Sequence, residues 1–131
     1  MAGISAYLEK AMLDWSLGGA APTRPSAWAV GLSLSAPTSA AGSEIATGSG
    51  WTRQTCPFPA AASPAGSASN SAAMTFGPAL TAAIFSGLQL WDTSAATTGN
   101  MLYYGLLATP RTLGVGDSLV IAAGALIITL A

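Results

Sequence analysis

Few residues in this sequence could carry acid–base or nucleophilic chemistry. The chain has no histidine and one cysteine, Cys56. Histidine is the commonest general base and the usual partner of a nucleophilic serine or cysteine, so both kinds of catalytic pair are excluded. A zinc site is also disfavoured, because it would lack its main ligands. Cys56 precedes a proline in a predicted strand, and we interpret it as a small apolar residue.

The five carboxylates offer the remaining route to catalysis. Two converging carboxylates can hydrolyse a glycosidic bond. Glu9 and Asp14 fall in a predicted helix, Glu44 in a loop, and Asp92 and Asp117 in predicted turns, where Asp commonly supports the turn. The segments "GVGD" and "GSG" do not open a helix and predict no phosphate site. We therefore expect a protein that is not an enzyme and holds no cofactor or metal.

The aromatic side chains are candidates for contact rather than for chemistry. Tryptophan and tyrosine are favoured at interfaces because they bury much area and keep a polar group. Trp28 falls on the apolar face of a predicted strand and is assigned to the core, whereas the other aromatics below could be core or interface. The candidate interface residues, four of them from the helix described next, are Ile4, Leu8, Met12, Trp15, Trp51, Trp91, Tyr103 and Tyr104.

The start of the chain predicts one amphipathic helix within residues 1–19. Ile4, Leu8, Met12 and Trp15 recur at helical spacing. Ser5 is suited to cap its N-terminus, and the glycines at 18–19 are suited to end it. The apolar stripe either packs on the chain's own core or docks on a neighbouring molecule.

From residue 27 the hydrophobic period changes to two. Candidate strands cover 27–35, 51–58, 73–78, 83–91 and 101–109, with turn signals between them. The pattern of 27–35 predicts one buried face. Residues 101–109 are apolar on both faces, which predicts a strand that is central or pressed against a second layer. Residues 59–73 predict a long loop. The fold is therefore predicted as mainly β, an antiparallel, jelly-roll-like sandwich or barrel with one short N-terminal helix, forming a single domain over 1–131 with the sandwich at 27–131.

The closing segment, "DSLVIAAGALIITLA", raises the question of a membrane anchor. Its apolar run is about a dozen residues, whereas a spanning helix needs about 20. Two short strands with a turn or bulge at Ala123 and Gly124 fit better, leaving an intersubunit strand or a lipid contact as alternatives. The N-terminal segment has no long apolar region typical of a secretory signal, so we expect synthesis in the cytoplasm and no membrane partner.

The charge content is low for a soluble domain. Charged residues make up 7% of the chain, against about 25% in ordinary soluble domains. A surface largely covered in an assembly explains this, although an alanine-rich monomer is also compatible. The four basic residues, Lys10, Arg24, Arg53 and Arg111, are scattered and make no patch to neutralise phosphates, so we expect no nucleic-acid partner.

Several stretches taken together resemble a known family. They are "ISAYLEKAMLDW", "WAVGLSLSAPT", "GSEIATGSGWTRQTCPF" and the segment from "LQLWDTSAATTGNMLYYG" to the end. Their order is similar to that of small tailed-bacteriophage virion proteins labelled phage tail fibre-like, which show "Y-x-R-Q", "G-N-L-L-Y-Y-G" and "G-D-x-L-x-F-x-A-G-x-L". The best matches are 50–54, 99–105 and 116–126. Trp51 stands where the family often has Tyr, and Ile121 where it often has Phe.

The resemblance implies a structural protein of the phage virion. With the small size and low charge, it leads us to expect a capsid decoration, or cement, protein that bridges major capsid protein subunits as a homo-oligomer, a trimer being one candidate. A tail or fibre-base component acting in host adsorption is the alternative. Two further alternatives are a carbohydrate-binding module, with Trp51 or Trp91 stacking on a sugar, and an enzyme.

Overall fold

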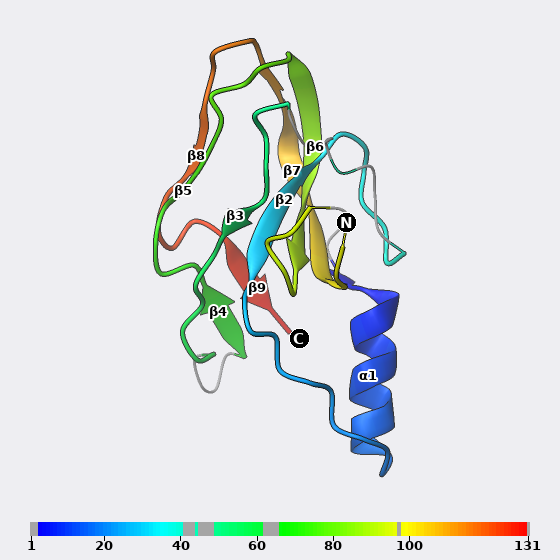
Figure 1. Cartoon of the computed structure of the whole chain (residues 1–131). Coiled ribbons are helices and arrows are strands. Elements are labelled where there is room, and N and C mark those ends of the chain that lie inside the picture. Colours follow the sequence, from blue (N-terminus) through cyan, green and yellow to red (C-terminus); the bar gives the residue numbers. More distant parts are fainter. Residues whose placement is uncertain (1–2, 41–43, 45–48, 62–65, 97, 131) are drawn as a thin grey trace.

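The computed structural model describes residues 3–40, 44, 49–61, 66–96 and 98–130. As predicted, the protein is mainly β, with antiparallel sheets in a sandwich-like arrangement and a helix near the N-terminus (Figure 1). The elements are β1 (Gly3–Ile4), α1 (Ala6–Ser16), β2 (Ala29–Ser33), β3 (Gln54–Thr55), β4 (Ser67–Ser69), β5 (Met74–Phe76), β6 (Ala83–Trp91), β7 (Met101–Leu113), β8 (Leu119–Ile121) and β9 (Ile127–Thr129).

One layer is a five-stranded sheet with the order β1-β7-β6-β2-β3. Against it lie two strand pairs, β5 with β8 and β4 with β9 (Figure 1). Every pairing is antiparallel. The strand over 101–109 was predicted to be central or pressed against a second layer, and β7 does lie between β1 and β6.

The core fills the space between the layers. Its buried side chains come from strands of both layers and from the segments next to β3 and after β5, and they are Val30, Leu32, Trp51, Cys56, Met74, Phe76, Ala79, Phe85 and Leu90. Trp51 meets the Phe85 ring edge to face at a centroid distance of 5.0 Å, and its Nε1 donates to the Thr81 carbonyl at 3.2 Å. The indole is therefore both packed and hydrogen bonded, as a buried tryptophan requires.

The expectation that 27–35 has one buried face is wrong, because β2 is buried at every position. The face carrying Ala29, Gly31 and Ser33 is covered as well. A Cβ on Gly31 would stand 2.3 Å from the Glu44 Oε1, so the carboxylate approaches the strand where only glycine leaves room. The small residues on this face allow other parts of the chain to pack closely against it, so they do not indicate a solvent-exposed face.

The helix begins later than the stripe implied. Ile4 lies in β1, paired with Tyr103, and is not helical. Ser5 is the N-cap, and its Oγ accepts a hydrogen bond from the Leu8 N–H at 3.1 Å. The helix ends before Gly18, whose positive φ of 93° favours glycine. The predicted N-cap and the predicted stop at the glycines are thus confirmed. The sandwich was predicted to cover 27–131, but it also includes residues 3–4.

Most strand boundaries differ from the predictions, and the largest differences are at β3, β4 and β7. β3 covers only Gln54–Thr55 of the predicted 51–58, and β7 runs on to Leu113. Pro110 interrupts no regular ladder, because it falls within a register irregularity opposite Phe85–Gly87. The predicted loop 59–73 contains β4, which pairs with β9, while residues 62–65 of that loop lie outside the described residues. The three small residues "SAS" form a strand because β9, which is distant in sequence, pairs with them.

The closing segment forms two strands with a turn between them, as predicted. Leu119–Ile121 and Ile127–Thr129 flank Gly124, whose φ is 77°. Leu126 and Ile128 pack against the core, and Ile127 faces outward. No helix in the described part of the chain has the length and apolar character needed to cross a bilayer.

Candidate functional site

The residues that could take part in catalysis or metal binding are dispersed and stabilise local structure. Asp92 accepts hydrogen bonds from the Asn100 N–H at 2.7 Å and from the Asn100 Nδ2 at 2.9 Å. Asp117 accepts from the Gly114 N–H at 2.7 Å. Both carboxylates therefore stabilise turns. Over the described residues, no three His, Cys, Asp or Glu side chains gather as metal ligands would. Burial raises the pKa of the Cys56 thiol to about 11, which disfavours the reactive thiolate.

The strongest polar constellation surrounds Arg53, which the sequence analysis did not single out. Its Nε and Nη2 donate to the two carboxylate oxygens of Glu44 at 2.6 and 2.7 Å. Its Nη1 donates to three carbonyl oxygens, those of Thr93, Ala95 and Thr98, at 3.2, 2.8 and 2.9 Å. The guanidinium also lies over the Trp91 ring, 3.9 Å from its centroid. All three nitrogens of the guanidinium therefore donate hydrogen bonds.

This arrangement gives Arg53 a structural role. The residue is 6% exposed, so its charge would be costly without the carboxylate beside it. Through the three carbonyls it fastens the segment after β6 to the sheet. The resembling motif at 50–54 contains this arginine. A basic residue within the predicted strand 51–58, in a chain with only four lysine and arginine residues, was the signal that could have identified the cluster.

The predicted interface aromatics of the sheets are not available as an exposed platform. Trp51 is in the core at 1% exposure, and Arg53 covers Trp91. Tyr103 is half-buried, which raises the pKa of its hydroxyl, and Tyr104 is half-buried beside Gly3. The expectation that Trp51 belongs to an interface is therefore wrong, because the second layer covers it. A sugar-stacking platform built on Trp51 or Trp91 is disfavoured for the same reason.

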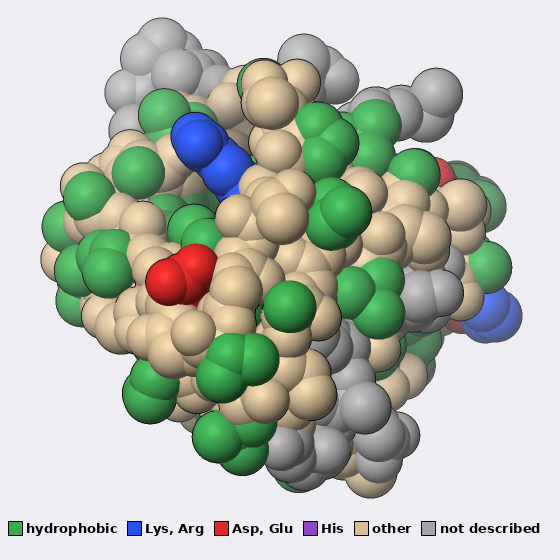
Figure 2. All heavy atoms as spheres, turned by 90° about the horizontal axis from the view of Figure 1, so that it is seen from above, with side chains coloured by type: hydrophobic (Ala, Val, Ile, Leu, Met, Phe, Trp, Pro, Cys, Tyr) green, Lys and Arg blue, Asp and Glu red, His purple; other side chains and the backbone are tan. Residues whose placement is uncertain are grey.

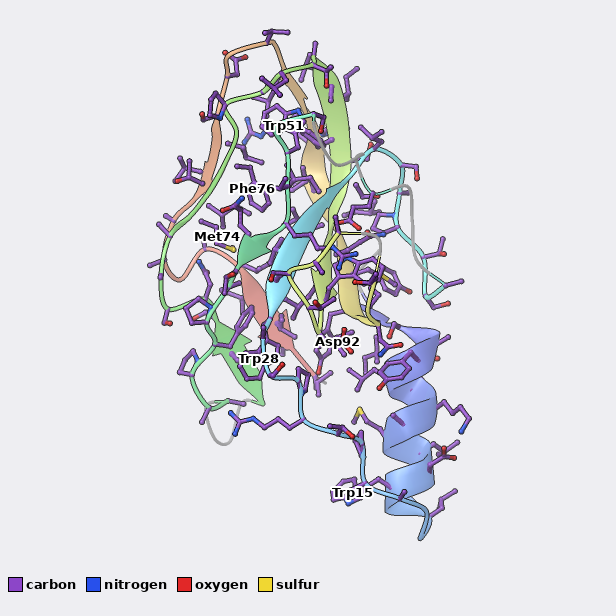
Figure 3. The ribbon with its side chains drawn as sticks, viewed as in Figure 1. Trp15, Trp28, Trp51, Met74, Phe76 and Asp92 are labelled. Carbon is purple, nitrogen blue, oxygen red and sulfur yellow. The ribbon has the colours of Figure 1, made fainter. Side chains whose placement is uncertain are left out.

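The helix α1, in contrast to the aromatic residues of the sheets, is largely exposed. Figure 1 shows α1 extending away from the sheets, and it contacts β7 near its N-terminal end. The helix contains no buried residue. Trp15 is 60% exposed and lies at the end of α1 farthest from the sheets (Figure 3). Met12 and Tyr7 are also exposed, whereas Leu8 is half-buried. The alternative in which the whole stripe packs on the chain's own core is therefore wrong.

An apolar groove of about 280 Å³ lies between β9 and the strands of the larger sheet. None of the residues that line it is charged. It is lined by Gly3 and Ile4 of β1, Val30 of β2, residues 88–90 of β6, residues 103–106 of β7 and residues 126–130 at β9. Leu130 remains 43% exposed there.

A second hollow of about 310 Å³ continues from this groove, since Leu90, Tyr103 and Ile128 line both. Its far side is formed by Trp28, Phe58 and Arg24, whose guanidinium lies 5.5 Å from the Trp28 ring centroid. In the described part of the chain, no carboxylate lies within ion-pair distance of Arg24. The molecule therefore offers two adjoining hollows, and Arg24 is among the residues that line the second.

Charged side chains are sparse on the surface too. The face seen from above carries a few, separated by hydrophobic and polar groups (Figure 2). The exposed large hydrophobic residues also include Leu13, Leu17, Leu80, Ile84, Val115 and Val120. Monomeric proteins rarely leave large contiguous apolar patches open to solvent, so the exposed apolar side chains of the helix and the groove are candidates for contact with another molecule.

A family model described as podophage GP4 fiber I protein gp80 matches residues 3–129 of the chain. The matched range includes α1, both layers of the sandwich and all the residues that line the groove except Leu130. No curated protein matches the chain.

Proposed function

The chain belongs to the podophage GP4 fiber I protein family, and from this membership we propose that it is a fibre component on the tail of a podophage virion. It is a structural protein of a tailed-phage virion. The observation that carries the proposal is the match over residues 3–129, which takes in all of the described elements.

The character of the described surface supports a role in contact. The helix and the groove expose apolar side chains, while the carboxylates Asp92 and Asp117 serve turns. A fibre component must bind its neighbours in the virion and hold a fixed shape. The buried Arg53 cluster and the two-layer core provide such a shape. We accordingly expect no enzymatic activity, and tail proteins as partners.

Capsid decoration remains the second candidate function. It is favoured by one observation, the charge content of 7%, which suits a small protein packed in many copies. The family description, a fibre protein, favours the tail. The choice between head and tail concerns the partner, the major capsid protein in one case and tail proteins in the other.

Immunogold labelling of intact virions with an antibody against this chain tests the proposal. Gold confined to the tail or its fibres is the expected result. Gold spread over the head would overturn it in favour of decoration, and absence of the chain from purified virions would overturn both. An adsorption assay extends the test. If the fibre contacts the host, an excess of the purified protein should compete with the phage and lower the adsorption rate.

A further inference from the structure

The direction of α1 is fixed where the helix starts. Ser5 is 1% exposed, its N–H donates to the Leu102 carbonyl at 2.9 Å, and its Oγ donates to the Met101 carbonyl. The Ala6 N–H donates to the Ser39 carbonyl at 2.9 Å. Folding the helix back over its own sandwich would break these buried hydrogen bonds. The apolar side of α1 therefore has to find its partner on another molecule.

That apolar side is a continuous surface. At 100° per residue, Tyr7, Leu8, Ala11, Met12 and Trp15 fall within an arc of about 140°. The arc contains no charged residue, and Lys10 and Asp14 pair with each other outside it. A partner surface for this arc must be apolar and uncharged, since burying an unpaired charge against it would be costly.

The groove beside β9 is uncharged and mostly apolar, with polar side chains only from Gln89, Thr129 and two tyrosines. Its lining residues carry no charge. The side of the groove from Leu126 to Leu130 spans four residue steps, about 13 Å at strand spacing. The 11 residues of α1 span about 16 Å. The groove is too small to admit a whole helix, which is about 10 Å wide, but it can take the side chains that a helix lays across its opening.

We propose that α1 of one copy of this chain lies across the groove of a second copy, with Trp15 and Met12 inserted between β9 and the larger sheet. This is a helix-in-groove contact of the kind that recurs in peptide recognition. It covers on each molecule the two apolar surfaces that the single chain leaves open.

Each copy has one helix to give and one groove to fill. Every copy is satisfied either by a two-fold dimer that exchanges both helices or by a closed ring. A stable interface buries about 800 Å² on each partner. In either assembly every chain contributes both its helix and its groove to the contact. The proposal holds for a fibre and for a capsid protein alike, so its failure would leave the proposed function standing.

The first experiment measures the mass of the full chain in solution by light scattering and sedimentation velocity over a range of concentrations. We expect a discrete oligomer. Trp15→Ser on the helix and Leu130→Ser in the groove should each weaken association by at least about tenfold. Val115→Ser, which removes an exposed side chain at 69% exposure away from both surfaces, is the matched control and should associate normally. A wild-type chain that stays monomeric, or an oligomer indifferent to Leu130→Ser, would overturn the proposal.

A cross-linking experiment distinguishes this contact from a bundle of helices. Chains carrying Trp15→Cys are mixed with chains carrying Leu130→Cys, both in a Cys56→Ala background, and are oxidised. A disulfide between the two kinds of chain is expected. Predominant linkage of Trp15→Cys chains to one another would show that α1 packs on α1, and would refute docking in the groove.

Discussion

The guanidinium of Arg53 lies over the ring of Trp91, 3.9 Å from the ring centroid, while its Nε and Nη2 bind the two carboxylate oxygens of Glu44. The arginine is thus enclosed by an aromatic face, a carboxylate and three backbone carbonyls. A cation so placed is difficult to replace, because no other side chain offers five donors in one plane.

Replacing Arg53 with methionine should destabilise the fold strongly. Arg53→Met keeps much of the stem but leaves Glu44, whose side chain is 17% exposed, without its partner. Breaking a buried pair costs about 3–5 kcal/mol, and the partial exposure of Glu44 favours the lower end. Urea unfolding measures the change. Arg111→Met, at an exposed position, is the control and should stay within about 0.5 kcal/mol. A cost below about 1 kcal/mol for Arg53→Met would contradict the structural role.

Substituting Trp51 should lower the stability of the fold, whereas substituting Trp15 should weaken association between chains. Trp51→Ala removes a fully buried indole and its bond to Thr81, and should cost about 3–5 kcal/mol of unfolding free energy. Trp15→Ala removes a side chain that is 60% exposed, and should change the stability of the monomer by less than about 0.5 kcal/mol.

Thermal and urea unfolding at a dilution where the chain is monomeric provide the comparison. The same two variants examined by light scattering should give the opposite ranking for association, as far as Trp51→Ala remains folded. Equal stability losses for both substitutions would mean that α1 packs on its own sandwich.

The thiol of Cys56 should make stability fall at high pH. Burial raises its pKa from 9.0 to about 11, so above pH 9 the unfolded chain loses a proton that the folded chain keeps. The stabilisation is full below pH 9 and is lost as pH rises toward 11. The loss should amount to about 2–3 kcal/mol at most. Urea unfolding of wild type and Cys56→Ala at a series of pH values checks this, and the stability difference between them should shift against wild type as pH rises.

Asn70 should be essential to the turn between β8 and β9. The residue is 1% exposed, and its Nδ2 donates to the carbonyls of Ala72 and Ala122 at 2.8 and 2.9 Å. Its Oδ1 accepts from the Leu126 N–H at 2.9 Å. Asn70→Ala leaves these groups unpaired and should cost about 2–3 kcal/mol.

Asn70→Asp provides a sharper version of the same test. A carboxylate can still accept from the Leu126 N–H but would face two carbonyl oxygens that need a donor. The variant should therefore be less stable than wild type at neutral pH, and should recover part of that loss in acid, where the carboxyl can donate. Urea unfolding at two pH values measures the recovery. A stability loss that does not change with pH would refute this account of the hydrogen bonds made by the Asn70 side chain.

Local patterns in the sequence predicted most of the strands and the helix caps. The alternation in 83–91 gave β6 with its observed bounds, and Ser5 and Gly18 marked the helix ends through their own chemistry. β4 escaped prediction because three small residues form a strand only when β9, some sixty positions away, supplies the hydrogen bonds. The Arg53 cluster escaped for a similar reason, since its carbonyl partners are distant in sequence and have no residue-type signature.

The sequence by itself determined the class of fold, the lack of a histidine-based catalytic site and the amphipathic character of the first helix, because these depend on residue types and short spacings. Only the tertiary structure decided which apolar surfaces are buried and which stay exposed. It buried Trp51 beneath the second layer, covered Trp91 with Arg53, and left Met12 and Trp15 open. Periodicity marks a side chain as apolar, but which surface covers it depends on how the layers and the helix are joined.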